Sequence, residues 1–404
     1  MRRFCCGLSV LIVLLFCACA NTQDYFVEYS LSQKIYTSGR VLTASEMARL
    51  EKQVGSLLQE IEDQVSVERE DSDIARINAA KAGESIEVGE HTYAMLQLCK
   101  QLTEQTDGAF SPALYNVSQL WGFTPEYAGS YQVSRAEPSA SEIEEALKNS
   151  DFSQLELTDE RLVTKINSAL RLDLGGIAKG YMSDCVRSLL LEQYEDVDGI
   201  ISVMSNSILL GEKQEDVRGL GYTSSLENPR RELSSGTNSG ALYFIDLSDA
   251  AVSTSADSYR FYVYNGKIYK HILDPKTGRP AENGVISITV LVPLNIPNAG
   301  ALADAFSTAG FCKPLTQSLA FYEKLWEDFG IGAVVLTSDY CYYSVGNYHV
   351  MQPTEYANLV NPELVDSVED MFVCRKPEDA QDEVIAHEKE KEYIDRMEQY
   401  NARA

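Results

Sequence analysis

The clearest pattern of hydrophobic and polar positions is helical and lies near the start of the chain. Apolar residues recur every three or four positions from Ser45 to Val65, which is the spacing of one buried helix face. Thr43 or Ser45 can cap this helix at its N-terminus. Further helices are predicted over residues 93–106, 140–149, 177–191, 303–311 and 315–329.

The region from residue 199 to residue 350 is dominated instead by short apolar runs typical of strands. Asn265-Gly266 is a strong two-residue hairpin turn, and a second hairpin is expected to turn at 158–160. A strand at 170–174 is expected to run into the helix at 177. Other strands are predicted over residues 200–203, 208–210, 242–246, 259–264, 267–271, 285–292, 333–337 and 341–345.

Charge narrows the classes of partner. The 404 residues include 34 basic and 60 acidic side chains, for a net charge of -26. Such a balance argues against a nucleic-acid surface and against adsorption to anionic lipid. The C-terminal residues 353–404 form an acidic tail with 14 acidic and 6 basic side chains. Within it, residues 378–400 are expected to be either a solvated helix or part of a flexible tail.

The first 19 residues have the features of a targeting segment. Arg2 and Arg3 precede an apolar run over residues 8–16. This run is too short for a membrane-spanning helix followed by a stop signal. Phe16-Cys17-Ala18-Cys19 resembles a bacterial lipoprotein box, in which Cys19 would be lipidated. We expect an exported protein held at the cell membrane by lipid alone, with plain secretion as the alternative. Residues 20–42 are read as a linker and first strand.

The five later cysteines lack C-x-x-C spacing, so no zinc site is expected, and the sequence leaves open whether one disulfide forms.

The densest candidate for ligand binding is the segment Asp173–Gly180, with three glycines and Lys179 before a predicted helix. Glycines at such a junction let backbone amides approach a ligand, and a lysine adds a point charge for phosphate. The alternative is a turn that only packs a helix onto a sheet.

Two further segments carry candidate chemistry. His271 is expected to end a strand beside a tight Asp-Pro and Thr-Gly turn, where a base or phosphate contact could work. Asp304 and Thr308 are four residues apart and share one helix face, so they could offer hard oxygens to Mg²⁺. The alternatives are a structural histidine and a helix cap. The polar run 253–257 either lines a pocket or forms a turn.

Together and in this order, these segments resemble the ApbE-type flavin transferases, the FAD:protein FMN transferases. The resemblance extends from about Glu70 to Thr337. It implies an α+β fold of mixed sheets with packed helices, T-fold-like, in a single large catalytic domain over residues 43–352. It also implies Mg²⁺-dependent transfer of the FMN half of FAD onto a threonine of another protein, with release of AMP. The matching segments are 71–78, 106–110, 120–123, 173–180, 227–230, 253–255, 271–278 and 303–309.

The resemblance also implies roles for particular residues. Asp304, Thr308 and the carbonyl of Gly176 would bind the metal, and His271 is the candidate base for the acceptor hydroxyl. The acceptor threonine would belong to a membrane redox complex or an exported flavoprotein. FAD contacts are implied for Ala109, Phe110, Ser111, Asp173, Lys179 and the backbone at Leu273.

Some positions depart from the family pattern. Ser111 stands where an aspartate is usual, Ser205-Asn206 replaces a glycine pair, and Ala256 replaces a common glycine. These changes leave two alternatives open. One is an FAD pyrophosphatase that uses water and releases free FMN and AMP. The other is a flavin-binding lipoprotein without catalysis.

Overall fold

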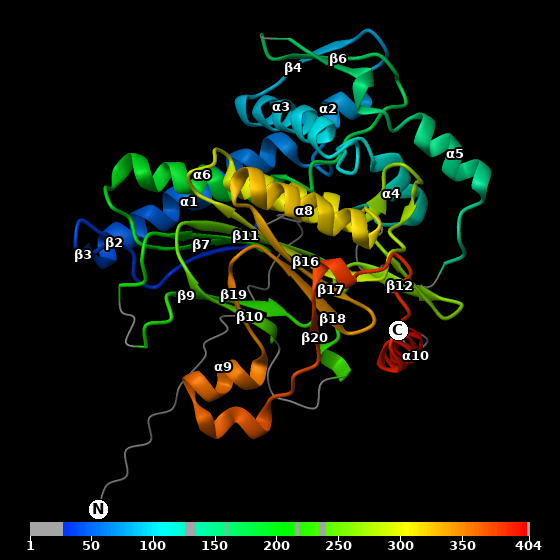
Figure 1. The fold of residues 1–404 in the computed structure, drawn as a ribbon. Coiled ribbons are helices and arrows are strands. Elements are labelled where there is room, and N and C mark those ends of the chain that lie inside the picture. Colours follow the sequence, from blue (N-terminus) through cyan, green and yellow to red (C-terminus); the bar gives the residue numbers. More distant parts are fainter. Residues whose placement is uncertain (1–26, 126–134, 159, 215–217, 234–239, 402–404) are drawn as a thin grey trace, which may run out of the picture.

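An eight-stranded sheet forms the centre of the molecule (Figure 1). The computed structural model describes residues 27–125, 135–158, 160–214, 218–233 and 240–401. Neighbouring strands are antiparallel except for the last pair, which is parallel. In spatial order the strands are β1 (Tyr29–Leu31), β7 (Gly199–Val203), β8 (Asn206–Leu210), β11 (Ala250–Ala256), β16 (Val285–Pro293), β17 (Gly332–Thr337), β18 (Cys341–Val345) and β20 (Val373–Arg375).

Helices cover one face of this sheet and a smaller sheet covers the other (Figure 1). The central strand β16 is buried on both faces: Ile288 and Val290 join the core under the helices, and Leu291 joins the core under the small sheet. The predicted α+β fold is confirmed. The helices are α6 (Ala178–Gln193), α7 (Ala299–Phe311) and α8 (Leu315–Phe329), with α1 (Ala44–Val65) against α6, and the small sheet is β9 (Tyr222–Glu227), β10 (Gly240–Leu247) and β19 (His349–Met351).

Smaller elements surround these layers. The predicted hairpins at 158–160 and at Asn265-Gly266 are both present, as β5 with β6 and as β12 with β13. These peripheral elements are β2 (Tyr36–Thr37), β3 (Arg40–Val41), α2 (Asp73–Ala79), β4 (Ser85–Glu87), α3 (Glu90–Gln105), α4 (Tyr115–Trp121), α5 (Ala140–Lys148), β5 (Leu155–Leu157), β6 (Leu162–Lys165), β12 (Phe261–Tyr264), β13 (Lys267–Lys270), β14 (Leu273–Asp274), β15 (Arg279–Pro280), α9 (Pro353–Val360) and α10 (Glu388–Asn401).

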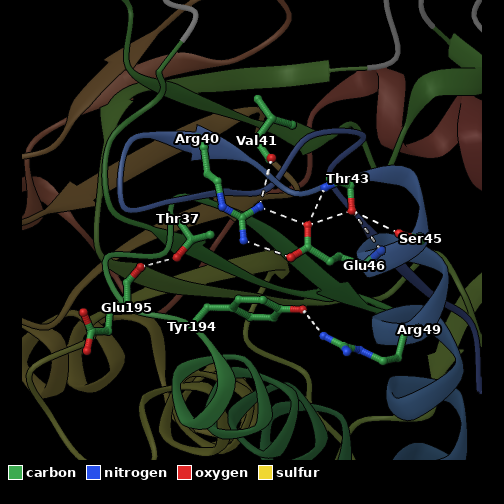
Figure 2. Close-up of polar contacts among 9 residues, drawn as sticks. All are labelled: Thr37, Arg40, Val41, Thr43, Ser45, Glu46, Arg49, Tyr194 and Glu195. Atoms are coloured by element: carbon green, nitrogen blue, oxygen red, sulfur yellow. Dashed lines mark hydrogen bonds and ion pairs between the residues drawn. The ribbon is translucent and has the colours of Figure 1, made fainter.

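The start of α1 is fixed by a capping box (Figure 2). The Thr43 hydroxyl accepts from the Glu46 amide at 3.3 Å, and the Glu46 carboxylate accepts from the Thr43 amide at 2.8 Å. Arg40 donates to the same carboxylate at 2.9 Å, and Arg49 reaches from α1 to the hydroxyl of Tyr194 at the end of α6. The predicted cap at Thr43 is therefore confirmed, and Arg49 separately ties α1 to the end of α6.

Two local predictions are wrong, and one open alternative is excluded. Residues 170–174 form no strand, because the side-chain amide of Asn78 bonds the backbone of Leu172 at 2.7 and 3.0 Å in place of a neighbouring strand. For the polar run 253–257 the turn alternative is excluded over residues 253–256, which belong to β11 in the main sheet. Helix α7 begins at Ala299, not 303, so Asp304 lies within the helix and is not its cap.

The acidic C-terminal segment is largely folded onto the domain. β20 adds the last strand of the main sheet, and α10 contacts β12. The helical alternative for residues 378–400 therefore holds over Glu388–Asn401, with Tyr393 buried against the domain.

Residues 1–26, including Cys19, lie outside the described residues. In the described part, none of the helices is long and apolar enough to cross a membrane, and the five later cysteines are free thiols.

Helices α6 and α7 cross closely at two glycines. A Cβ added to Gly180 would lie 2.1 Å from the carbonyl oxygen of Gly300, and one added to Gly300 would lie 2.5 Å from the Gly180 oxygen. Asp184 fixes the crossing, because its carboxylate accepts from the amides of Gly300 and Ala301 at 2.9 Å each. Backbone can therefore pass backbone only where both positions lack a side chain.

Gly180→Ala should destabilise the protein by about 3 kcal/mol or more, since the new methyl meets rigid backbone that no rotamer change can move. Urea unfolding of the full-length protein measures the change. Gly55→Ala is the matched control within α1, where the added Cβ meets only the Tyr29 hydroxyl at 3.3 Å and helix propensity improves. Equal stability losses in the two variants would contradict the steric argument.

Candidate active site

The site is built around the buried carboxylate of Asp304 in the middle of α7, which is 3% exposed. Lys179 at the start of α6 places its ammonium nitrogen 3.1 Å from Asp304 Oδ1. The amide of Gly180 donates to Oδ2 at 3.2 Å, and the Ser253 hydroxyl of β11 donates to Oδ1 at 3.5 Å. A carboxylate this deeply buried is stable only with such partners. The α6–α7 crossing provides two of them.

A group of hydroxyls lies one helical turn further along α7. Ser307 and Thr308 donate to the carbonyl of Asp304 at 2.9 and 3.3 Å. Ser255 of β11 lies 2.7 Å from the Ser307 hydroxyl and 3.4 Å from that of Thr308. Ser255 and Thr308 are half-buried, so their oxygens lie at the boundary between the core and solvent.

The glycine-rich segment lies against the same hydroxyls. A Cβ at Gly176 would sit 3.8 Å from Thr308 Oγ1 and 3.3 Å from the ring of Phe110, so the backbone of Gly176 is close to both. Lys179 also donates to the Gly175 carbonyl at 2.8 Å. The Asp173 carboxylate accepts from the Gly175 amide at 2.8 Å and shapes the turn. The structure thus brings together three segments that are distant in sequence.

Other predicted contacts lie around this centre. Ala109 and Phe110 are buried, and the half-buried Ser111 accepts from the Ala113 amide at 3.2 Å, which orders the loop. Leu273 is further away: its carbonyl accepts a bond from the Cys312 thiol at the C-terminal end of α7. Leu273 is therefore placed beside α7 but is not brought into contact with Asp304.

His271 is held in one orientation just after β13. Its Nδ1 lies 3.1 Å from the carbonyl of Arg260, and its ring meets Phe123 edge-on at 6.5 Å. Because a carbonyl can only accept, Nδ1 carries the proton and Nε2 keeps its lone pair. Burial, together with the positive charges of Arg260 and Lys179, lowers the pKa of His271 to about 4. The ring is therefore neutral at pH 7 and able to accept a proton.

The donor set fits a hard divalent cation. Among the described residues, no three His, Cys, Asp or Glu side chains cluster as a metal site. The oxygens present are one carboxylate, several hydroxyls and the nearby backbone of Gly176, and Mg²⁺ accepts such a sparse set because it keeps bound waters. Zinc would require more nitrogen or sulfur ligands.

Four polar residues of this region had no predicted role of their own. Ser253, Ser255 and Ser307 face Asp304 or Thr308, and only the polar composition of 253–257 signalled a pocket lining. Asn206 pairs with Ser253 across the sheet and is 1% exposed. Within the described part of the chain, neither end of its carboxamide has a hydrogen-bond partner. The departure at Ser205-Asn206 thus lies beside the site.

Comparison with known proteins identifies the family of this chain. The model of the ApbE family matches residues 27–331, and the chain belongs to this family. An FAD:protein FMN transferase of Treponema pallidum is 30% identical over 307 residues, which cover 73% of this chain and 79% of that protein. One of Vibrio cholerae is 29% identical over 242 residues, which cover 60% and 68%. The resemblance found in the sequence is confirmed.

Solved structures have the same fold. The ApbE protein of Thermotoga maritima superposes with a TM-score of 0.62 at 26% identity, covering 81% of this chain and 98% of that one. The apo flavinyl transferase ApbE of Pseudomonas stutzeri gives a TM-score of 0.60 at 24% identity, covering 83% and 98%. The predicted ApbE-like architecture is therefore confirmed.

Lys179 and Asp304 should be coupled by about 2 kcal/mol in a double-mutant cycle. Lys179→Met leaves a buried carboxylate without its cation, and adding Asp304→Asn removes that charge, so the double variant should recover part of the lost stability. Urea unfolding of the four proteins measures the coupling. The exposed pair Lys324 and Asp328 is the control, where coupling should be much smaller. Strictly additive effects at Lys179 and Asp304 would contradict the ion pair.

Proposed function

We propose that this chain catalyses Mg²⁺-dependent transfer of the FMN half of FAD onto a threonine hydroxyl of an acceptor protein, releasing AMP. The main support is the juxtaposition of Asp304, Thr308 and Gly176 beside Lys179. This arrangement can hold a cation next to a pyrophosphate in a protein of net charge -26. Family membership gives further support, since relatives are named FAD:protein FMN transferases.

Each residue then has a defined task. Asp304, Thr308 and the Gly176 carbonyl would hold Mg²⁺, which would supply Lewis-acid polarisation of the phosphoryl group under attack. Lys179 leaves its pairing with Asp304 to neutralise pyrophosphate charge. The turn at Asp173 and the backbone at Leu273 contact FAD, as do Ala109, Phe110 and Ser111.

The reaction exchanges one phosphorus–oxygen bond for another. The threonine oxygen forms a bond to the phosphorus of the FMN half, the bond to the bridging oxygen breaks, and AMP leaves with that oxygen. The threonine proton moves to Nε2 of His271, whose lone pair is free because Nδ1 faces the Arg260 carbonyl. A neutral histidine with a low pKa is ready for this step at pH 7.

The cellular setting is also part of the proposal. Cys19 would carry the lipid, and the enzyme would act outside the cytoplasm on an exported flavoprotein or a membrane redox complex. The sequence of residues 1–19 supports export. No nucleic-acid partner is proposed, given the net charge of -26.

Incubation with FAD, Mg²⁺ and a threonine-containing acceptor domain should give AMP and a fluorescent acceptor band in a denaturing gel. Asp304→Asn should slow transfer by at least about 10³-fold, because the metal supplies several kcal/mol of transition-state stabilisation. Asp328→Asn, on the exposed face of α8, is the matched control and should keep full activity.

Three results would contradict parts of this assignment. Full activity of Asp304→Asn would exclude the metal site. Free FMN and AMP without acceptor labelling would indicate the pyrophosphatase. FAD binding without AMP or FMN would indicate the non-catalytic flavin-binding protein.

His271→Gln should reduce the transfer rate by roughly 10²-fold, which is typical for loss of a general base. In the native protein the His271 ring should titrate near pH 4. NMR can follow this titration, and the resonance that is missing in His271→Gln identifies the ring. Transfer should therefore persist as pH falls through 6.5 and decline only near 4, where Nε2 becomes protonated. The exposed His349→Gln is the control. A ring midpoint near 6.5 would contradict the burial argument.

A further inference from the structure

The guanidinium of Arg230 is a buried charge near the site whose hydrogen bonds are all made. Its side chain is fully buried, just after the end of β9. Two of its nitrogens donate to Asp257 at 2.7 and 2.9 Å, and Nε and Nη2 donate to Glu390 at 2.7 Å each. Nη1 also donates to the Pro229 carbonyl at 3.1 Å. All five donors of the guanidinium are thus used.

The two carboxylates come from segments that are far apart in the sequence. Asp257 directly follows β11, two residues after the site hydroxyl of Ser255. Glu390 belongs to α10, and Tyr393 from the next turn of α10 lies 4.4 Å from the guanidinium carbon. Arg230 therefore joins the C-terminal helix to the strand end that carries part of the active site.

Helix α10 also packs along the hairpin that leads to His271. Tyr393 forms a small core with Phe261 and Val263 of β12. At the tip of the hairpin, the Glu398 carboxylate accepts from the Gly266 amide at 2.7 Å. The view in Figure 1 places α10 beside β12 at the edge of the molecule. The hairpin is held at its tip and along its length, and Arg230 fixes the adjoining strand end.

The buried charges balance only when α10 is in place. Lys270, the residue before His271, is buried and donates to the Val285 carbonyl at 2.8 Å. Its charge and that of Arg230 are matched by Asp257 and Glu390, and all four interact electrostatically. Without Glu390 the group would carry excess positive charge out of contact with water, which favours rearrangement of the backbone next to His271.

We infer that α10 is an intramolecular brace for the active site, in which Glu390 and Arg230 are positioning residues that hold the His271 hairpin and the Ser255 end of β11. Helix α10 lies beyond residue 331, where the match to the ApbE family ends. The brace therefore lies outside the region that the family model matches. The inference rests on the proposed function for its effect on catalysis, while its effect on the hairpin is independent of that function.

The test compares full-length Glu390→Ala and Glu390→Gln with the native protein, well below their unfolding temperatures. Glu390→Ala should lower kcat for FMN transfer roughly tenfold or more, because misplaced catalytic groups lose rate steeply. KM for FAD should change less than kcat, because the main contacts of α10 are with β12 and with the residues around Arg230. Amide hydrogen exchange over residues 261–272 should rise in the same variant, and Glu390→Gln should fall between the two. Asp395→Ala removes an exposed carboxylate from the same helix and should match the native protein.

A lowered melting temperature with unchanged kcat and unchanged exchange at 261–272 would overturn the brace and leave only a structural role. If Glu390→Ala does not fold, Glu398→Ala tests the tip contact in the same way. If the native protein transfers no FMN, the proposed function fails. The exchange measurement then decides the brace alone: raised exchange supports it, and unchanged exchange overturns it.

Discussion

The close crossing of α6 and α7 is the constraint on which the rest of the site depends. Two glycines allow the helix backbones to touch, and Asp184 holds the first amides of α7 in place. Burial raises the pKa of that carboxyl to about 6, so the crossing carries its own electrostatic cost. In return it sets Lys179 and the Gly180 amide against Asp304. A wider separation of the two helices would leave the Asp304 carboxylate without these partners in the core.

Ion pairs between distant segments connect the site to the remainder of the fold. The protein carries a net charge of -26, yet its candidate ligand is itself an anion. Positive charge is instead placed locally: Lys179 pairs with Asp304, and Arg230 is neutralised by two buried carboxylates. Both arrangements join segments more than a hundred residues apart in the sequence. The tertiary structure, rather than overall composition, therefore sets the electrostatics of catalysis.

Predictions from local pattern succeeded where a single face or turn decides the structure. The helix α1, the capping residue Thr43 and the Asn265-Gly266 turn follow from spacing and side-chain chemistry alone. Failures occurred where a distant group replaced a local partner. Asn78 supplies the hydrogen bonds that a strand at 170–174 would have needed, and Asp184 lets α7 begin before residue 303. Such partners leave no periodic signal in the segment that they stabilise.

The sequence by itself determined the family, the mixed helix-and-strand fold and the candidate site residues, because each motif keeps its chemistry within a few neighbouring positions. Asp304 and Thr308 were recognisable four residues apart, and Lys179 by its glycines. Only the tertiary structure decided which hydroxyls surround them and that α10 reaches Arg230. Those contacts arise where separate elements pack together, and the partners of a buried polar group are fixed by that packing.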